Sequence, residues 1–175
     1  PSSQILALSA TITNSKDLAG WMGAELVDVS WRPVPLLEGV YQHGQIQFAD
    51  GSAKEVESTN RGAAIDVAVD ILVEGGQALI FTETRKRAVA TAAKASEVSE
   101  RFLSEAEKQR LQQIAEDVLE AGEETELSRR LGEAVRNGAA FHHAGLSNQH
   151  RRIVEDAFRR GSIKILAATP TLAAG

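Results

Sequence analysis

Cysteine is absent from the chain of 175 residues, and methionine occurs once. The lack of thiols excludes a disulfide framework, a cysteine nucleophile and a cysteine-ligated zinc or iron–sulfur site, and it favours an intracellular, cytoplasmic location. Uninterrupted apolar runs are all far shorter than the roughly 18 residues that a membrane span requires. The sequence therefore predicts no membrane segment, and its apolar share of 43% is typical of a globular fold.

An initiator methionine and a signal peptide are also lacking at Pro1, where the chain begins. The last residues, 172–175, are small and apolar. From these two ends we expect a piece cut from a longer protein. The length suffices for one hydrophobic core and a further short segment.

Charge is unevenly distributed along the chain, whose formal net charge is −5. Residues 88–128 hold four basic and ten acidic side chains, whereas residues 129–175 hold eight basic and three acidic ones. A polyanion is repelled by the first segment and attracted by the second. If nucleic acid is bound, we expect it near the last third of the chain, although solvated helix faces also explain both charge runs.

Apolar runs alternate with helix-forming segments. We expect buried strands at residues 4–9, 26–29, 78–81, 139–142 and 163–167. Two further strands are expected at residues 37–41 and 46–49, the second followed by an Asp50-Gly51 hairpin turn. Helices are expected at residues 14–22, 60–74 and 147–160, and through 84–132 with breaks near 99–104 and 122.

This alternation predicts an α/β fold, a parallel sheet with helices on both faces. Ligands of such sheets bind in the loops at the carboxyl ends of the strands. Those loops are rich in hydroxyls, small residues and cations, and they span residues 9–11, 82–85, 143–145 and 169–171. Short donors and close main-chain approach suit a phosphodiester backbone, so the loops predict a nucleic-acid site.

Four segments resemble motifs of the superfamily-two helicases. Residues 8–11 (Leu-Ser-Ala-Thr) resemble motif III, residues 78–82 motif IV, and residues 141–146 (Phe-His-His-Ala-Gly-Leu) motif IVa. Residues 167–175 (Ala-Ala-Thr-Pro-Thr-Leu-Ala-Ala-Gly) resemble the first part of motif V. The residues of motifs IVa and V are most similar to those of the Ski-like group, and within it to those of archaeal DNA helicases related to the helicase part of polymerase theta.

In that family two RecA-like domains close on ATP and Mg²⁺, and the second domain holds the translocating strand. The resemblance implies that residues 1–33 are the end of domain 1 and that residues 34–175 are domain 2, with a helical acidic insert. It implies an ATP-dependent 3′-to-5′ DNA helicase of repair or replication forks. Its partners would be single-stranded or forked DNA, domain 1, and downstream domains of the same chain.

Individual roles follow from the same resemblance. Motif III would couple the nucleotide state to the grip on nucleic acid through Ser9, Ala10 and Thr11. Gly175 would stand where motif V turns toward the nucleotide. The residues implied to lie near backbone phosphates are Thr82, Arg85, His143, Gly145, Arg151, Thr169 and Thr171.

The sequence also lacks the parts that perform hydrolysis in this family. It contains no Gly-x-x-x-x-Gly-Lys-Ser/Thr to cradle phosphates, no Asp-Glu-x-His to hold magnesium, and no arginine-bearing motif VI. We therefore expect no catalytic residue and no ATP hydrolysis from this chain alone. A non-catalytic RecA-like module for binding protein or nucleic acid is the alternative, and an RNA helicase of the same group stays open.

Other polar residues have simpler interpretations. Neighbouring strand residues point to opposite faces, so we expect a packing role for His142, a strand-end loop role for His143, and no metal. Asp66 and Asp70 share a helix face, where we expect them to be solvated. Residues 88–128 are either an outer helical hairpin away from nucleic acid or a docking surface for a partner protein.

Overall fold

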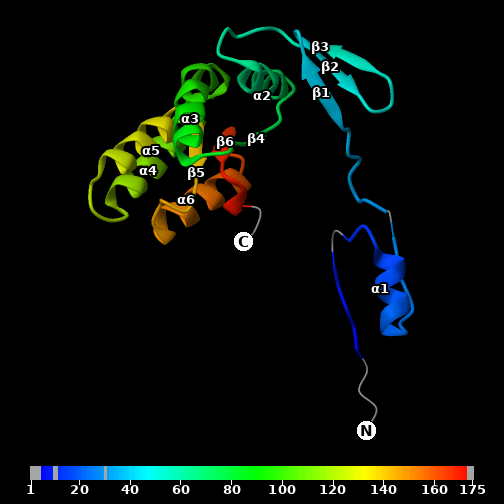
Figure 1. Cartoon of the computed structure of the whole chain (residues 1–175). Helices are drawn as coiled ribbons and strands as arrows, with labels where there is room; N and C mark the ends of the chain where they lie inside the picture. Colours follow the sequence, from blue (N-terminus) through cyan, green and yellow to red (C-terminus); the bar gives the residue numbers. More distant parts are fainter. Residues whose placement is uncertain (1–4, 10–11, 30, 173–175) are drawn as a thin grey trace. The chain divides into compact units, whose positions relative to one another are not determined.

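The computed structural model describes residues 5–9, 12–29 and 31–172. The chain divides into two compact units, Pro1–Leu37 and Glu38–Gly175 (Figure 1). No helix within the described ranges is both long and apolar enough to cross a membrane.

Among its described residues the first unit has one helix, α1 (Ser15–Met22), which follows Asn14 and ends at Gly23 as the sequence predicts. Gly23 has a φ of 60°, the left-handed conformation that stops a helix at little cost for glycine. The strands expected at 4–9 and 26–29 are wrong for the described residues, which are not paired into any sheet. A strand is defined by ladder partners, and Leu8, 85% exposed, has no sheet to cover it among the described residues.

The second unit opens with an antiparallel meander of β1 (Gly39–Gln42), β2 (Gln45–Phe48) and β3 (Ala53–Glu55). The predicted Asp50-Gly51 turn joins β2 to β3, and the Asp50 carboxylate accepts hydrogen bonds from the Ser52 amide and hydroxyl. The strand β3 is short and polar, and its residues carry no apolar pattern that would predict a strand.

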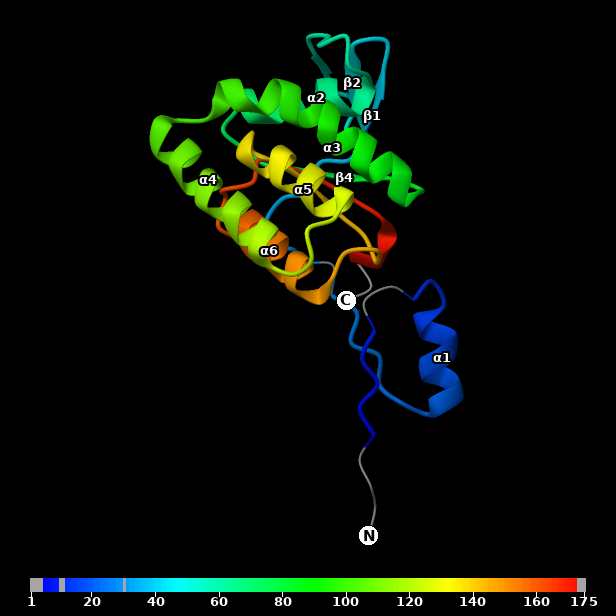
Figure 2. The ribbon, with the colours of Figure 1, turned by 90° about the vertical axis from the view of Figure 1, so that its left-hand side faces the viewer.

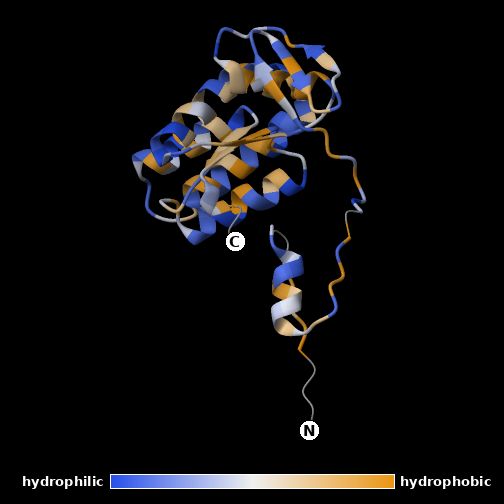
Figure 3. Cartoon of the chain, turned by 45° about the vertical axis from the view of Figure 1, so that its right-hand side comes forward, coloured by the Kyte–Doolittle hydropathy of each residue, from blue (hydrophilic) through white to orange (hydrophobic). Residues whose placement is uncertain are grey.

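A parallel sheet forms the centre of the second unit. Its strands are β4 (Ala78–Phe81), β5 (Ala139–His142) and β6 (Ile165–Ala168), in the spatial order β4-β6-β5. All residues of β5 and β6 are buried, and Figure 3 shows these strands as an apolar centre. The register aligns Phe81, Ala168 and His142, so the three strands end at the same edge.

Helices surround this sheet, with breaks in the predicted regions. They are α2 (Ala63–Val73), α3 (Arg85–Ser99), α4 (Glu105–Glu120), α5 (Glu126–Arg136) and α6 (Asn148–Arg159), with 3₁₀ turns at Glu100–Phe102 and Pro170–Leu172. Gly75, with a φ of 80°, follows α2, and Ser104, Thr125 and Ser147 each cap the helix after them.

The two faces of the sheet are covered by different helices. Ala139 and Ile165 pack with residues of α2 and with Ala95 of α3. On the opposite face, His142 bonds Glu155 of α6. The expected fold, a RecA-like parallel sheet with helices on both faces and a helical acidic insert, is confirmed (Figure 1).

The helical hairpin of α4 and α5, residues 105–136, lies on the β5 side of the sheet. Helix α5 packs against β5 and α3, and α4 packs against α5 and α6 (Figure 2). The Nε2 atom of His150 in α6 lies 2.9 Å from the carbonyl oxygen of Val118 in α4, which joins the two helices inside the core. The hairpin is therefore an integral part of the fold.

Candidate nucleic-acid interface

Three of the four predicted loops meet at the carboxyl edge of the parallel sheet. The Thr82 amide donates to the Ala168 carbonyl at 2.8 Å, and the Thr169 amide donates to the His142 carbonyl at 3.1 Å. Each strand end is thus tied to the start of a neighbouring loop. The structure brings together the loops that begin at Thr82, His143 and Thr169, and we call them the carboxyl edge.

Hydroxyl groups of the carboxyl edge are held by local hydrogen bonds. The Thr82 hydroxyl lies 3.4 Å from the Ala168 carbonyl oxygen and 3.3 Å from that of Thr84. The hydroxyls of Thr169 and Thr171 are 2.9 Å apart. Thr169 is buried and Thr171 is exposed, so the pair leads from the interior to a surface where a phosphate oxygen can accept a hydrogen bond.

Two arginines bring positive charge to this edge. Arg85 is the exposed first residue of α3, and its Nη1 atom lies 3.5 Å from where a Cβ on Gly145 would be. The guanidinium thus reaches from the first loop to the second. Arg151 lies in the first turns of α6, where its Nη2 atom bonds the Asn148 side chain. Its Nε atom is buried without a hydrogen-bond partner among the described residues.

His143 is buried, with 2% of its surface exposed. Its ring stacks on Phe141 with centroids 5.5 Å apart, and its Nδ1 atom accepts a hydrogen bond from the Gly145 amide at 3.1 Å. Burial lowers the pKa of His143, and the positive charge of Arg85 and the neighbouring His142 lower it further. A ring so enclosed and kept neutral shapes the loop, as the strand-end role predicted, and does not present a charge to solvent.

His142 points to the other face, as the alternation of strand residues predicts. It is 3% exposed, and its Nε2 atom lies 2.9 Å from the Glu155 carboxylate of α6. Glu155 also pairs with Arg159. The packing role expected for His142 is confirmed. Among the residues that the structure describes, no group of His, Asp or Glu is arranged to hold a metal ion.

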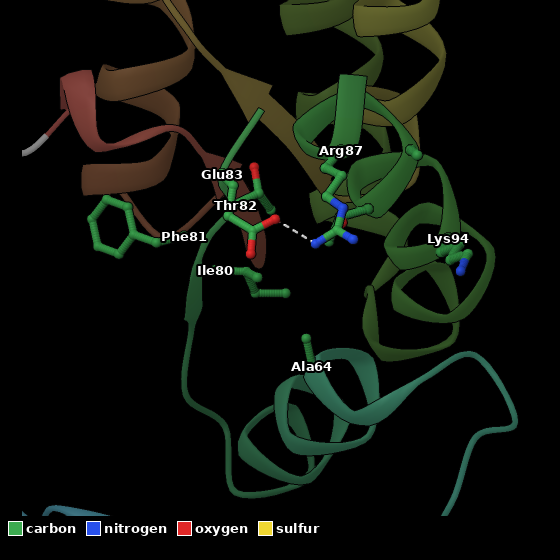
Figure 4. Close-up of a pocket in the computed structure, with 9 residues that line it drawn as sticks. Ala64, Ile80, Phe81, Thr82, Glu83, Arg87 and Lys94 are labelled. Atoms are coloured by element: carbon green, nitrogen blue, oxygen red, sulfur yellow. Dashed lines mark hydrogen bonds and ion pairs between the residues drawn. The ribbon is translucent and has the colours of Figure 1, made fainter. Parts of the chain in front are cut away.

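A pocket of about 440 Å³ adjoins the carboxyl edge beside the end of β4 (Figure 4). Its walls come from α2, β4 and α3, with Thr82 on one side and the Glu83–Arg87 ion pair across its mouth. Lys94 lines its far end, nine residues beyond Arg85, or about 14 Å along the helix axis. Sequence reasoning missed this pocket, because α2 and α3 are brought together by tertiary packing.

The remaining predicted site residues are Ser9, Ala10, Thr11 and Gly175. Ser9 is exposed in the first unit. Ala10, Thr11 and Gly175 lie outside the described residues. Their predicted roles in coupling and beside the nucleotide therefore stay predictions.

The expectation of a solvated face for Asp66 and Asp70 is wrong. Asp66 is 5% exposed, and its carboxylate accepts hydrogen bonds from the Thr59 amide and hydroxyl and from the Tyr41 hydroxyl. Burial raises the pKa of Asp66, but these hydrogen bonds outweigh it and lower the pKa below its ordinary value. Asp70 pairs with Lys54 of β3. Both carboxylates fasten the meander and its following loop to α2, a tertiary contact that helical spacing does not reveal.

Known proteins similar to this chain are archaeal helicases. ATP-dependent DNA helicase Hel308 of Methanocella arvoryzae is 48% identical over 175 residues, which is 98% of this chain and 23% of that protein. The proteins of the same name from Methanocaldococcus jannaschii and Pyrobaculum calidifontis are both 46% identical, over 97% and 98% of this chain. This chain spans 14% and 24% of those two proteins.

The similarity covers nearly the whole chain and includes both units, whereas no family model matches. The chain spans less than a quarter of the length of these three curated relatives. The resemblance found in the four motifs is confirmed, and this chain is a segment related to the Ski-like superfamily-two helicases.

Proposed function

We propose that this chain forms the strand-holding part of the second motor domain of an ATP-dependent 3′-to-5′ DNA helicase. In this proposal residues 34–175 belong to that domain, and residues 1–33 are the end of the first. The observation that carries the proposal is the meeting of three loops, with hydroxyls, a glycine and two arginines, at one edge of a parallel sheet. The names of the relatives support DNA as the substrate.

The grip acts on the phosphates of a single strand laid across the carboxyl edge. Arg85 and Arg151 supply charge that a phosphate can pair with, and Thr82, Thr169 and Thr171 supply short hydroxyl donors. Gly145 lets the strand approach the main chain closely because it has no side chain. Such contacts carry no base sequence, which suits a motor that moves along any strand.

Hydrolysis is assigned to other parts of the full-length protein. The 175 residues contain no phosphate-cradling Gly-x-x-x-x-Gly-Lys-Ser/Thr sequence and no Asp-Glu-x-His sequence. ATP and Mg²⁺ would therefore be held mainly by residues outside this chain, with Gly175 at the border of their site. The charge-stabilising groups that give phosphoryl transfer most of its rate would also lie there. The pure chain is expected to show no magnesium-dependent ATPase activity.

The test is binding of a fluorescent oligo-dT strand to the pure chain, followed by anisotropy over a range of salt concentrations. We expect weak binding at low salt that is lost steeply as salt rises, because counterions are released from the strand. Arg151→Glu and Arg85→Glu should each weaken binding, and each should reduce the slope of log affinity against log salt by about 0.7.

Lys94→Glu is the matched control, because it makes the same charge change on α3 but about 14 Å from Arg85 along the helix. Binding by this variant should stay close to that of the unmodified chain. Equal losses from Lys94→Glu and Arg151→Glu would contradict a grip at the carboxyl edge.

A further inference from the structure

We propose that His143 is a positioning residue for this grip: through its Nδ1 atom it holds Gly145, and through Gly145 it sets the place of Arg85. The inference rests on the proposed function, because it names how one contact of the strand-holding edge is built. It differs from the role implied by the family resemblance, in which His143 itself lies near a phosphate.

The ring of His143 is fixed on two sides. Phe141, 1% exposed, stacks on the ring at an interplanar angle of 13°. The Gly145 amide donates to Nδ1 at 3.1 Å, and the Leu146 amide donates to the His143 carbonyl at 3.0 Å. His143 therefore accepts two hydrogen bonds that fix the turn after β5, one at its ring and one at its carbonyl oxygen.

The ring of His143 and the guanidinium of Arg85 both approach the position where Gly145 lacks a Cβ. A Cβ at this position would lie 3.0 Å from Nδ1 and 3.1 Å from Cε1 of His143, closer than ordinary van der Waals contact. The same Cβ would lie 3.5 Å from Nη1 of Arg85. Both side chains therefore converge on the space left by the missing side chain of Gly145, so a shift of the ring or of the Gly145 main chain would change the space that Arg85 occupies.

The protonation state of the ring follows from these neighbours. An Nδ1 atom that accepts a hydrogen bond carries no proton, so the proton of the neutral ring is on Nε2. Burial lowers the pKa of His143, as do the charges of Arg85 on α3 and of His142 on its own strand. A second proton on Nδ1 would face the Gly145 N–H and add a positive charge beside Arg85. The ring therefore serves as a neutral acceptor in a basic site.

Two substitutions of His143 distinguish the effect of its hydrogen-bond acceptor from the effect of its volume. His143→Asn places an amide oxygen close to where Nδ1 stands, whereas His143→Leu fills the space without an acceptor. Affinity for oligo-dT at low salt should change less than about threefold in His143→Asn and fall about tenfold in His143→Leu, the cost of one charge-assisted contact. The salt slope should fall by about 0.7 in His143→Leu alone.

Two further measurements keep the inference testable if His143→Leu folds poorly. Gly145→Ala keeps the histidine but places a Cβ 3.0 Å from its Nδ1 atom, so the ring and the turn must shift and the variant should also lose about tenfold in affinity. Nitrogen-15 spectra of the imidazole should show a neutral ring at pH 7 with the proton on Nε2.

The possible failures are distinct. No strand binding by the unmodified chain would overturn the proposed function itself. Binding by the unmodified chain with equal affinities for His143→Asn and His143→Leu, or an unchanged affinity for Gly145→Ala, would overturn the role of His143 alone. A ring protonated on Nδ1 at pH 7 would also overturn it.

Discussion

The carboxyl edge and the helical hairpin of α4 and α5 satisfy their polar groups in different ways. The hairpin closes its own helix ends with two capping boxes, one of Ser104 with Glu107 and one of Thr125 with Ser128. At the edge, three buried nitrogen atoms lack a hydrogen-bond partner, and they are the whole set of such side-chain atoms found in the described part of the chain. They belong to His142, His143 and Arg151, all in or beside the loop after β5.

The two regions also differ in how far their charged side chains form ion pairs. The exposed surface of the hairpin pairs its charges locally, as Lys108 does with Glu105 and Arg130 with Glu126. The edge presents Arg85 and Arg151, and for Arg85 no ion pair is found within the described ranges. Native proteins leave few buried polar groups unpaired, so these three nitrogen atoms set the edge apart from the hairpin. The hairpin packs into the core through Leu111, Ala115 and Leu131, so we expect substitutions at these positions to change stability.

The largest effect on stability is expected from Leu111→Ala, which truncates a core residue of the hairpin. Leu111 of α4 is 0% exposed and belongs to the main core cluster, so its truncation should lower the free energy of unfolding by about 2–5 kcal/mol. Denaturant unfolding measures this change. Gln109→Ala, on the exposed side of the same helix, is the control and should stay within about 0.5 kcal/mol.

The comparison also requires that the folded Leu111→Ala chain still binds oligo-dT with unchanged affinity. A loss of affinity as large as that of Arg151→Glu, measured where the variant is fully folded, would show that the hairpin takes part in binding.

The ion pair between Glu107 and Lys164 makes the stability of the hairpin depend on pH. The Lys164 ammonium, 2.6 Å away, lowers the pKa of Glu107, and the amide and hydroxyl of Ser104 lower it further, to about 2. A carboxyl with a depressed pKa adds stability above its ordinary pKa of 4.5, and this stability is lost as the pH falls toward 2. The free energy of unfolding should therefore decrease over this range.

Lys164→Gln removes the partner charge, so the pKa of Glu107 should return toward its ordinary value. Unfolding in denaturant at a series of pH values from 5 to about 2 should then show a shallower loss of stability in the variant. Identical slopes for the two chains would mean that the pair does not link the residue before β6 to α4 in solution.

Ser104→Ala is expected to have the smallest effect. It removes the hydroxyl that accepts from the Glu107 amide and opens the capping box of α4, which should cost about 1 kcal/mol of unfolding free energy. Ser104→Asp keeps an N-cap acceptor and should recover most of the loss in thermal or denaturant unfolding. If both variants lose the same stability, the cap is not what holds this end of the hairpin.

Much of the second unit could be predicted because its signals are local. The apolar run of residues 78–81, the Asp50-Gly51 turn and the cap at Ser147 each act over a few residues, and the structure has each in place. The strands predicted at 4–9 and 26–29 fail because strand formation depends on partners elsewhere. The burial of Asp66 was missed for a similar reason, since its hydrogen-bond donors are Tyr41 and Thr59 outside its helix.

The sequence predicts which loops form the candidate site but not how their side chains are arranged. Parallel strands must end at one edge, so the meeting of the loops at Thr82, His143 and Thr169 follows from the strand pattern. The burial of His143 had one usable signal, because a period of two places it on the same face as Phe141. The approach of Arg85 to the empty Cβ position of Gly145 had no such signal, since it depends on how α3 packs beside β5.

Mapping by two-dimensional amide NMR tests the central claim most directly. Oligo-dT titrated into the labelled chain at low salt should shift the amide signals of residues 82–85, 143–145 and 169–171 and leave those of residues 105–126 unchanged. Shifts concentrated on α4, or on the meander of β1, β2 and β3, with none at the three loops would contradict a strand held at the carboxyl edge.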